Sequence, residues 1–217
     1  MTAAPTPLPR RFFARDTLTV ARALLGHLLV HQGLRGRRIG RIVEVEAYRG
    51  PRDPASHAYR PTPRSLIMYG QPGLAYVYFT YGMHFCVNVV TETRSRAGAV
   101  LLRALEPVEG LEPDGRVPPA RVAAGPGRLT RAMGIDRRHN GLDLTRPPLY
   151  IADGGAARRR MTRGRIVSGP RIGISVAMHR PWRFGVERHP SLSRPFERSR
   201  ARRPSAAPGG DARSAAW

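Results

Sequence analysis

Two segments rich in Val, Tyr and Phe, residues 74–80 and 85–90, are separated by only four residues. β-branched and aromatic residues favour extended strands, and so short a connection lets two strands pair only in the antiparallel direction. The connecting residues Tyr81-Gly82-Met83-His84 therefore form the tip of a predicted β-hairpin. A hairpin of this kind indicates a largely antiparallel sheet.

Further strands and two helices are predicted around this hairpin. Apolar residues at helical spacing follow Asp16 or Thr17 and stop at Gly26, and a second helix begins at residues 125–127 and closes at Gly134. Strands are predicted at residues 27–31, 41–48, 99–105, 149–151 and 171–176, with Pro107 stopping the third and residues 154–165 forming an Arg/Gly-rich loop. Strands outnumber helices, which favours a mixed α/β (α+β) fold with flanking helices.

The chain of 217 residues has the length of one domain. Residues 1–10 are rich in Pro and are expected to be a flexible leader. Residues 188–217 consist mainly of Arg, Pro, Ser and Ala, so we expect a disordered tail there. The folded domain is accordingly predicted to span residues 11–187.

The basic residues are all arginine, and the formal net charge is +22. Codon bias explains the absence of lysine, but it does not explain 15 acidic residues against 37 basic ones. This excess predicts a polyanionic partner, which can be DNA, RNA or an anionic membrane. No apolar run approaches the roughly 20 residues of a membrane helix, so we expect a cytoplasmic protein. The single cysteine, Cys86, excludes a disulfide within the chain and a multi-cysteine metal site.

Two glutamates alternate along the predicted strand 41–48. Strand periodicity places Ile42, Glu44, Glu46 and Tyr48 on one face, and the residues between them on the opposite, core face. A carboxylate on the first face is a candidate general base if it is partly desolvated. The alternative is a solvated strand face whose glutamates pair with the abundant arginines.

The loop and the hairpin tip carry further candidates. His57 follows Asp53 by four residues, and with a nearby Glu these side chains can bind a metal. Two closely spaced ligands are weak evidence for such a site, because a loop histidine is commonly exposed, and it can also stack on a ring or donate a hydrogen bond. Tyr81 and Met83 are large apolar side chains at a turn, where they can act as a wedge that unstacks DNA bases or can fold against a loop. Gly127 lies where backbone N–H groups at a helix start can meet a phosphate.

At these residues the sequence resembles the alkyladenine, or 3-methyladenine, DNA glycosylase family. The resemblance covers residues 12–184. It is carried by Leu24-Leu25-Gly26, Glu44-Val45-Glu46-Ala47-Tyr48, Gly50-Pro51, Ala55-Ser56-His57, Thr62-Pro63-Arg64, Pro72-Gly73, Tyr76-Val77-Tyr78, Tyr81-Gly82-Met83, Cys86, Asn88, residues 102–107, Gly125-Pro126 and Arg183-Phe184. Pro61 and Ser65 depart from the pattern, in which glycine and asparagine are usual.

The resemblance implies a single domain with a curved antiparallel sheet and a protruding hairpin. It also implies that Glu46 activates water, and that Arg103 holds either a phosphate or Glu46 itself. The other implied roles are the base pocket (Tyr48, His57, Tyr78 and Asn88), the wedge (Tyr81 and Met83) and the DNA contacts (Arg64 and Gly127). No metal or organic cofactor is implied.

The leading hypothesis is a monofunctional DNA-repair glycosylase. It would flip alkylated or deaminated purines out of double-stranded DNA and hydrolyse the N-glycosidic bond, leaving an abasic site. We expect a monomer that is nucleoid-associated if the source is prokaryotic. Without lysine, a Schiff-base lyase step has no side-chain amine.

Two alternatives remain open at this stage. Glu44 and Glu46 have the spacing of an acid/base pair for an inverting glycosidase acting on an oligosaccharide. Arginine and exposed aromatic residues also suit a non-enzymatic module that binds RNA or ribosomes.

Overall fold

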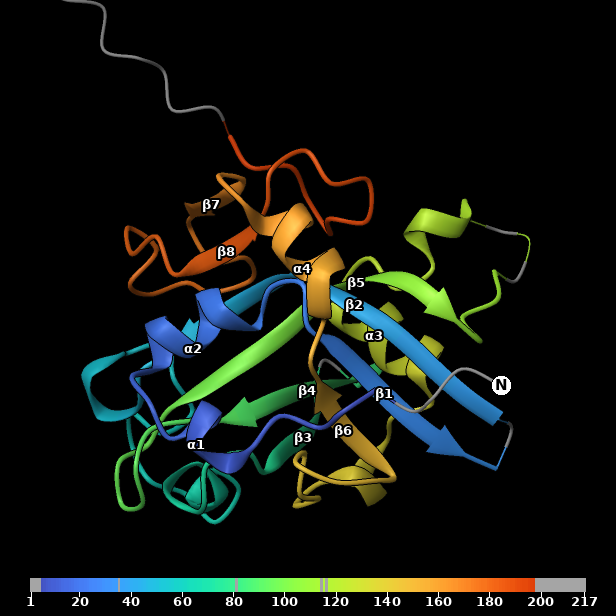
Figure 1. The fold of residues 1–217 in the computed structure, drawn as a ribbon. Helices are drawn as coiled ribbons and strands as arrows, with labels where there is room; N and C mark the ends of the chain where they lie inside the picture. The colour runs from blue at the N-terminus through green and yellow to red at the C-terminus, as the bar shows by residue number, and fades with distance from the viewer. Residues whose placement is uncertain (1–4, 35, 81, 114, 116, 198–217) are drawn as a thin grey trace, which may run out of the picture.

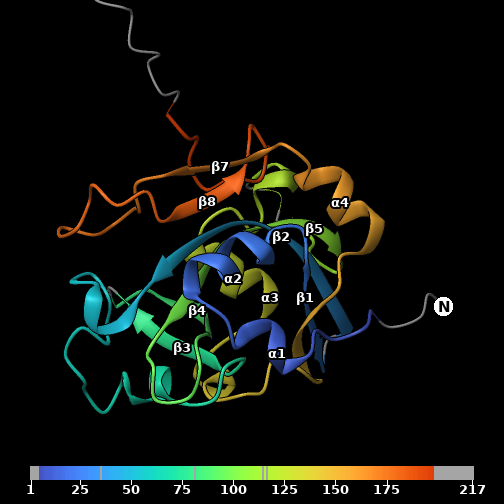
Figure 2. The same cartoon turned by 60° about the vertical axis from the view of Figure 1, so that its left-hand side comes forward.

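The computed structural model describes residues 5–34, 36–80, 82–113, 115 and 117–197. Within these residues, eight strands pair antiparallel in one curled sheet (Figure 1). The strands are β1 (Leu28–Gly33), β2 (Gly36–Tyr48), β3 (Ala75–Thr80), β4 (His84–Val90), β5 (Ala99–Glu109), β6 (Leu149–Ala152), β7 (Ile166–Gly169) and β8 (Arg183–Val186). The order is β3-β4-β5-β2-β1-β6, and β8 pairs with both β2 and β7 (Figure 2). The prediction of one α+β domain with an antiparallel sheet is confirmed.

The central strand β2 is irregular at Val43. Its pairing with β5 shifts register between Ile42 and Glu44, as in a β-bulge. The extra residue puts Ile42 in the apolar core together with Val45 and Ala47. The predicted face for Ile42 was therefore wrong, whereas Glu44 and Glu46 do share the face opposite the core residues that follow them.

Strand β5 does not stop at Pro107, as the sequence suggested, but continues to Glu109. Pro107 pairs with Gly40 beside a second register shift, between Ile39 and Gly40. A proline lacks the N–H that a strand interior needs, and a bulge is one of the places where a sheet accommodates it.

Four helices are found in the described part of the chain: α1 (Arg10–Phe13), α2 (Thr17–Leu24), α3 (Pro126–Met133) and α4 (Gly155–Thr162). Asp16 caps α2 by accepting from the N–H groups of Leu18 and Thr19, as predicted. Gly134 closes α3 with a φ of 68°. Helix α4 replaces the loop predicted at residues 154–165, because Ala and Arg favour helix and Arg158 bonds the Ala23 carbonyl at the end of α2.

Helix α3 fills a gap where β4 and β5 diverge. These strands pair only from Asn88 to Val90, and beyond this point β5 bonds the segment that leads into α3 through Gly125 N to Arg103 O. Helix α3 contacts both strands, and its Thr130 hydroxyl donates to the Phe85 carbonyl. The divergence leaves the site cavity between the strands and the start of α3.

The predicted strand at residues 171–176 is absent, because this segment bends instead. Gly173 has a φ of 78°, which interrupts an extended course. Arg171 is drawn inward to Asp53, with Nη2 at 2.8 Å from Oδ1. The segment therefore forms part of the wall of the cavity rather than an edge of the sheet.

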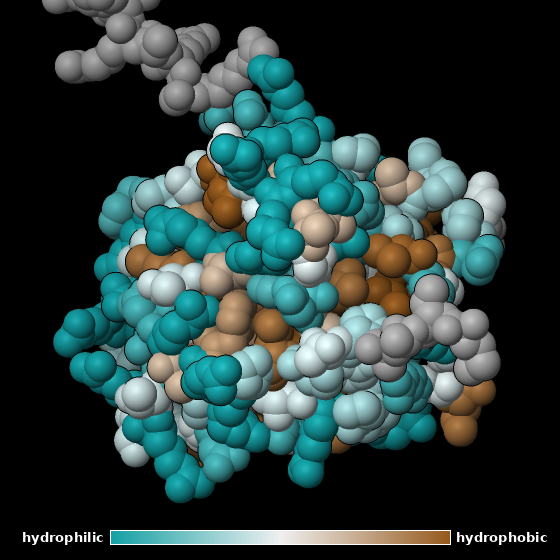
Figure 3. Space-filling model, viewed as in Figure 1, coloured by the Kyte–Doolittle hydropathy of each residue, from teal (hydrophilic) through white to brown (hydrophobic). Residues whose placement is uncertain are grey.

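The two predicted end segments are partly packed. Pro7 bridges to Ala152 and Leu8 is buried, although both lie in the predicted leader. Ser191 and Leu192, in the predicted tail, are buried as well. Their contacts extend the packed domain beyond residues 11–187 at both ends. The face that carries α1, α2 and α4 shows mostly hydrophilic side chains with scattered hydrophobic ones (Figure 3).

Within the described residues, no helix combines the length and the apolar character that crossing a membrane requires.

Candidate active site

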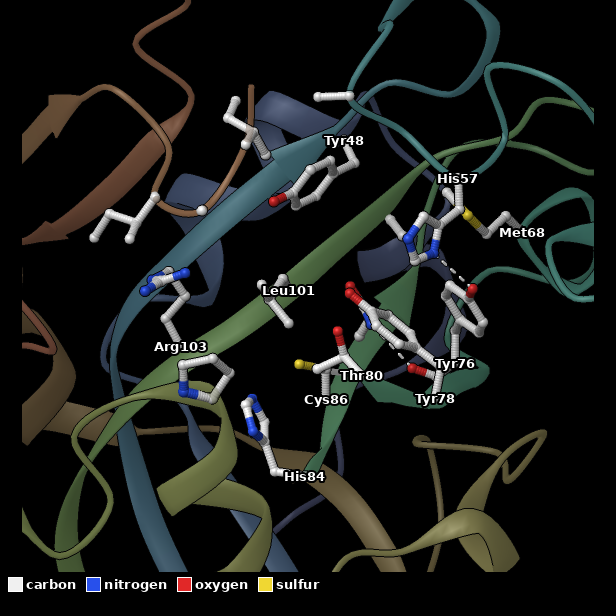
Figure 4. Close-up of a pocket in the computed structure, with 17 residues that line it drawn as sticks. Tyr48, His57, Met68, Tyr76, Tyr78, Thr80, His84, Cys86, Leu101 and Arg103 are labelled. Carbon is white, nitrogen blue, oxygen red and sulfur yellow. Dashed lines mark hydrogen bonds between the residues drawn. The ribbon is translucent and has the colours of Figure 1, made fainter. Parts of the chain in front are cut away.

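A cavity of about 320 Å³ opens on the face of β3, β4 and β5 (Figure 4). It is bounded by strand residues, by the loop around His57, by residues 172–174 and by Pro126 at the start of α3. Of the side chains predicted to form the site, the structure places Tyr48, His57, Tyr78, Asn88 and Arg103 in the lining. The predicted residues therefore come together from separate segments.

One side of the cavity is an aromatic wall, formed by His57, Tyr76 and Tyr78. The His57 and Tyr78 ring centroids are 4.7 Å apart, and those of Tyr76 and Tyr78 are 5.1 Å apart. His57 Nδ1 lies 2.8 Å from the Tyr76 hydroxyl. Burial, and then the Arg64 charge, lowers the pKa of His57, which keeps the imidazole neutral at pH 7.

Arg64 covers the outer part of this wall. Its guanidinium carbon lies 4.4 Å from the Tyr78 ring centroid, in a cation–π arrangement. The Arg64 side chain thus lies at the rim, where it can also meet a phosphate. Burial raises the pKa of the Tyr78 hydroxyl, so the ring stays uncharged.

Asn88 forms part of the floor beside the aromatic wall. It is buried on β4, and its Nδ2 donates to the Tyr76 carbonyl at 3.1 Å. This bond fixes the orientation of the amide. Cys86 lines the cavity two residues earlier on the same strand, and burial raises the pKa of its thiol to about 11.

The opposite side holds an ionic cluster, formed by Glu44, Glu46, Arg103 and Arg183. Both glutamates are fully buried. Glu46 Oε1 accepts from the Ile172 N–H at 2.7 Å and lies 3.2 Å from Arg103 Nη1, while its Oε2 accepts from the Tyr48 hydroxyl at 2.8 Å. Tyr48, Arg103 and Ile172 line the cavity, so Glu46 lies directly behind that wall.

Burial raises the pKa of Glu46 against the opposing effect of Arg103. A carboxylate with a raised pKa is a stronger base than an exposed one. The solvated strand face considered from the sequence is therefore wrong for these glutamates, although the expected pairing with arginine is present. Arg103 holds Glu46, which is one of the two roles that the resemblance allowed.

Glu44 is held from several directions. Its Oε1 lies 3.0 Å from Arg103 Nε and 3.4 Å from Arg183 Nη1, and Ser193 donates to both of its oxygens. Its Oε1 has three donors, and two of its partners, Arg183 and Ser193, lie outside the lining of the cavity. The glycosidase alternative, which needs Glu44 as a free partner of Glu46, loses its geometric basis.

Asp53 and His57, which were considered as metal ligands, are both engaged with other side chains. Both oxygens of the fully buried Asp53 contact the Arg171 guanidinium. His57 lies instead against Tyr76 and Tyr78. Among the described residues, no group of three potential ligands is arranged to hold a metal.

Of the remaining predicted residues, Met83 and Gly127 are not in the lining of this cavity. Met83, at the hairpin tip, is 73% exposed. Tyr81 lies outside the described residues. Gly127 packs against His84, a cavity residue, and a Cβ at Gly127 would approach the His84 ring to 2.6 Å. Glycine at this position is thus required by packing, whether or not its N–H meets a phosphate.

Several residues that contribute to the site were not predicted from the sequence. Tyr76 shares a strand face with Tyr78, and that alternation could have identified it. Ile172 lies in a segment that was predicted to be a strand, and Arg183 belongs to the residues that carry the resemblance, but neither was given a role in the site. Ser193 lies in a segment that was expected to be disordered. For Ser193 no signal was available in the sequence.

Comparison with known proteins agrees with this geometry. The sequence model of the methylpurine-DNA glycosylase family matches residues 11–190. The chain belongs to this family. A relative from Anaeromyxobacter dehalogenans is 49% identical over 193 residues, which cover 87% of each chain. One from Rhodopseudomonas palustris is 48% identical, covering 88% of this chain and 90% of its own.

A relative from Myxococcus xanthus is 48% identical over 171 residues, covering 78% of this chain and 83% of its own. All three relatives are provisionally named 3-methyladenine DNA glycosylase. The resemblance noted from the sequence is therefore confirmed, and this methylpurine-DNA glycosylase family member acts in DNA repair.

Proposed function

We propose that this protein flips alkylated or deaminated purines out of double-stranded DNA and hydrolyses their N-glycosidic bond with a water activated by Glu46. The observation that carries the proposal is the placement of a buried carboxylate directly behind one wall of a cavity whose opposite wall consists of aromatic rings packed edge to face. A base cannot be processed inside the duplex, so the enzyme needs such a pocket outside the helix.

The aromatic wall suits an electron-poor base. Ring faces of Tyr and His attract positively charged or electron-poor rings, and alkylation of a purine ring nitrogen makes the base cationic. Tyr48, His57 and Tyr78 would sandwich the flipped base. Asn88, whose amide is fixed by Tyr76, would face the exocyclic groups and reject the 2-amino group of guanine.

The reaction would proceed by displacement at C1′. Glu46 accepts a proton from water, the water oxygen bonds to C1′, and the electrons of the broken bond leave with the base nitrogen. A cationic alkylated purine then departs as a neutral base. Arg103 would orient the carboxylate throughout, because it lies within 3.2 Å of Glu46.

The hairpin tip and its neighbours would handle the DNA around the flipped nucleotide. Exposed Met83, together with Tyr81, would fill the space that the base leaves. Arg64 at the rim and Gly127 near the start of α3 would contact phosphates. We infer that the protein acts as a monomer in the cytoplasm, on nucleoid DNA.

The experiment is an assay of base release from duplexes that carry 3-methyladenine, 7-methylguanine, hypoxanthine or ethenoadenine. We expect release of the free base from at least one lesion duplex, an uncut abasic strand, and no covalent adduct after borohydride treatment, because no lysine can form a Schiff base. Strand cleavage with a trapped adduct would contradict the hydrolytic step. Absence of release from every duplex would contradict the proposed function.

A further inference from the structure

The segment that follows Pro190 lies against the ionic cluster. Ser193 N donates to Glu44 Oε2 at 2.6 Å, and Ser193 Oγ donates to Glu44 Oε1 at 2.7 Å. The same hydroxyl oxygen accepts from Arg103 Nη2 at 3.3 Å. One serine thus contacts both an acidic and a basic member of the cluster.

The segment is anchored on both sides of Ser193. Before it, Leu192 is buried and its carbonyl accepts from Arg121 Nη1. After it, the Pro195 carbonyl accepts from Arg183 Nη2 at 3.0 Å, and the Arg183 guanidinium lies 3.8 Å from the Phe196 ring centroid. The position of Ser193 is therefore fixed by packing as well as by its own hydrogen bonds.

Arg103 has a different partner for each of its nitrogens. Nε contacts Glu44, Nη1 contacts Glu46 and Nη2 contacts Ser193. A planar guanidinium that is held at three corners has one orientation available to it. Loss of the Ser193 corner would let the group rotate, and the Arg103–Glu46 contact would loosen with it.

We propose that Ser193 is a positioning residue for base excision, which holds Glu44 and Arg103 in the arrangement that orients Glu46. This inference rests on the proposed function of Glu46. It extends the machinery of the site past residue 190, where the match to the family ends. Ser193 acts through Arg103 and Glu44 and does not need to touch DNA.

The charged groups around Glu46 determine its pKa and therefore the pH dependence of excision. The titratable groups that face it are Glu44 and Tyr48 on β2, Arg103 on β5, Arg183 on β8 and Cys86 on β4. Arg103 lowers the pKa of Glu46, whereas burial raises it. A loosened Arg103 would leave the pKa of Glu46 higher, so excision would need a higher pH to reach its plateau.

The test compares Ser193→Ala, Ser193→Thr and Ser191→Ala in single-turnover excision across pH, with thermal unfolding measured for each. Ser191 is buried in the same segment, and its backbone N–H donates to His189 Nδ1, a bond that the alanine variant keeps. We expect Ser193→Ala to lose roughly 5- to 10-fold in plateau rate, as for one hydrogen bond. Its acid limb should move to higher pH, with DNA affinity unchanged. Threonine should restore both values, and Ser191→Ala should match the wild type.

Two results would overturn the inference. One is a normal rate and a normal acid limb in Ser193→Ala. The other is that Ser191→Ala loses as much excision rate and as much thermal stability as Ser193→Ala, which would show that the segment contributes only to folding. Glu46→Gln, assayed in parallel, distinguishes failure of the proposed general base from failure of the Ser193 inference. A normal rate there removes the general base and this inference together, whereas its inactivity beside a normal Ser193→Ala removes only this inference.

Discussion

The aromatic wall comes from residues 57–78, whereas the ionic cluster draws on β2, β5 and β8 and is held by a segment near residue 193. The rings of the wall leave faces open to the cavity and share few polar contacts. The charges of the cluster are buried and bonded to one another. A wall with open faces can accept bases of differing shape, and a fully paired cluster cannot shift without leaving a charge unpaired. The proposed function assigns recognition to the aromatic wall and chemistry to the ionic cluster.

The largest effect is expected from Glu46→Gln, which tests whether the chemistry belongs to the ionic cluster. Removal of a lone general base should slow excision by roughly 10²–10⁴-fold, while affinity for lesion-bearing DNA is retained. Single-turnover base release and a gel-shift titration measure the two quantities. Glu109→Gln is the matched control, because Glu109 pairs with Arg37 at the far end of β5 and is 41% exposed. Near-normal excision in Glu46→Gln would remove the chemistry from the ionic cluster.

A smaller effect is expected on the other side, from Tyr78→Leu. Loss of one stacking face should weaken lesion-duplex binding by about 1–3 kcal/mol, or roughly 5- to 150-fold, with a lesser change in rate at saturating enzyme. Tyr76→Phe keeps its ring and loses only the hydroxyl that contacts His57 and Arg64, so it should stay within about threefold of the wild type. If Tyr78→Leu reduced the saturating rate and left affinity unchanged, recognition would not belong to the aromatic wall.

The smallest effect concerns Cys86, which lies beside Tyr78 and also experiences the charges of Arg103 and Glu46. Burial raises the pKa of this thiol to about 11, so the thiolate is scarce below that pH and grows about tenfold per pH unit as pH rises toward it. Alkylation by iodoacetamide, followed by mass spectrometry, should be slow at pH 8 relative to glutathione and accelerate up to pH 10. A rate at pH 7 equal to that of glutathione would show that the cavity does not shield the thiol.

The sequence predicted those parts of the fold in which neighbouring residues decide the structure. The hairpin of β3 and β4 follows from its aliphatic and aromatic content, and helix α3 follows from its terminal glycines. Glu46 and Tyr48 were identified through strand alternation and family resemblance together. In each case the pattern lies within one short segment.

The missed features depend on distant partners. The bulge at Val43 arises from how β2 pairs with β5, and no neighbouring residue is of a type that predicts an irregular strand. Residues 171–176 resemble a strand, but Arg171 is committed to Asp53 in a loop more than a hundred positions earlier. Ser193 gains its place from Glu44, on a strand at the other end of the chain. Composition alone made that segment appear unstructured.

The bulge at Val43 also limits how the gene can change. Substitutions along β2 leave the alternation of the strand intact, but deletion of the extra residue would shift one part of the strand relative to its partners. A one-residue deletion beyond the bulge, such as loss of Val45, would also turn Glu46 toward the core and Ala47 away from it. Insertions and deletions between Glu44 and Tyr48 should therefore be purged by selection, whereas substitutions that keep the length of the strand leave its faces unchanged.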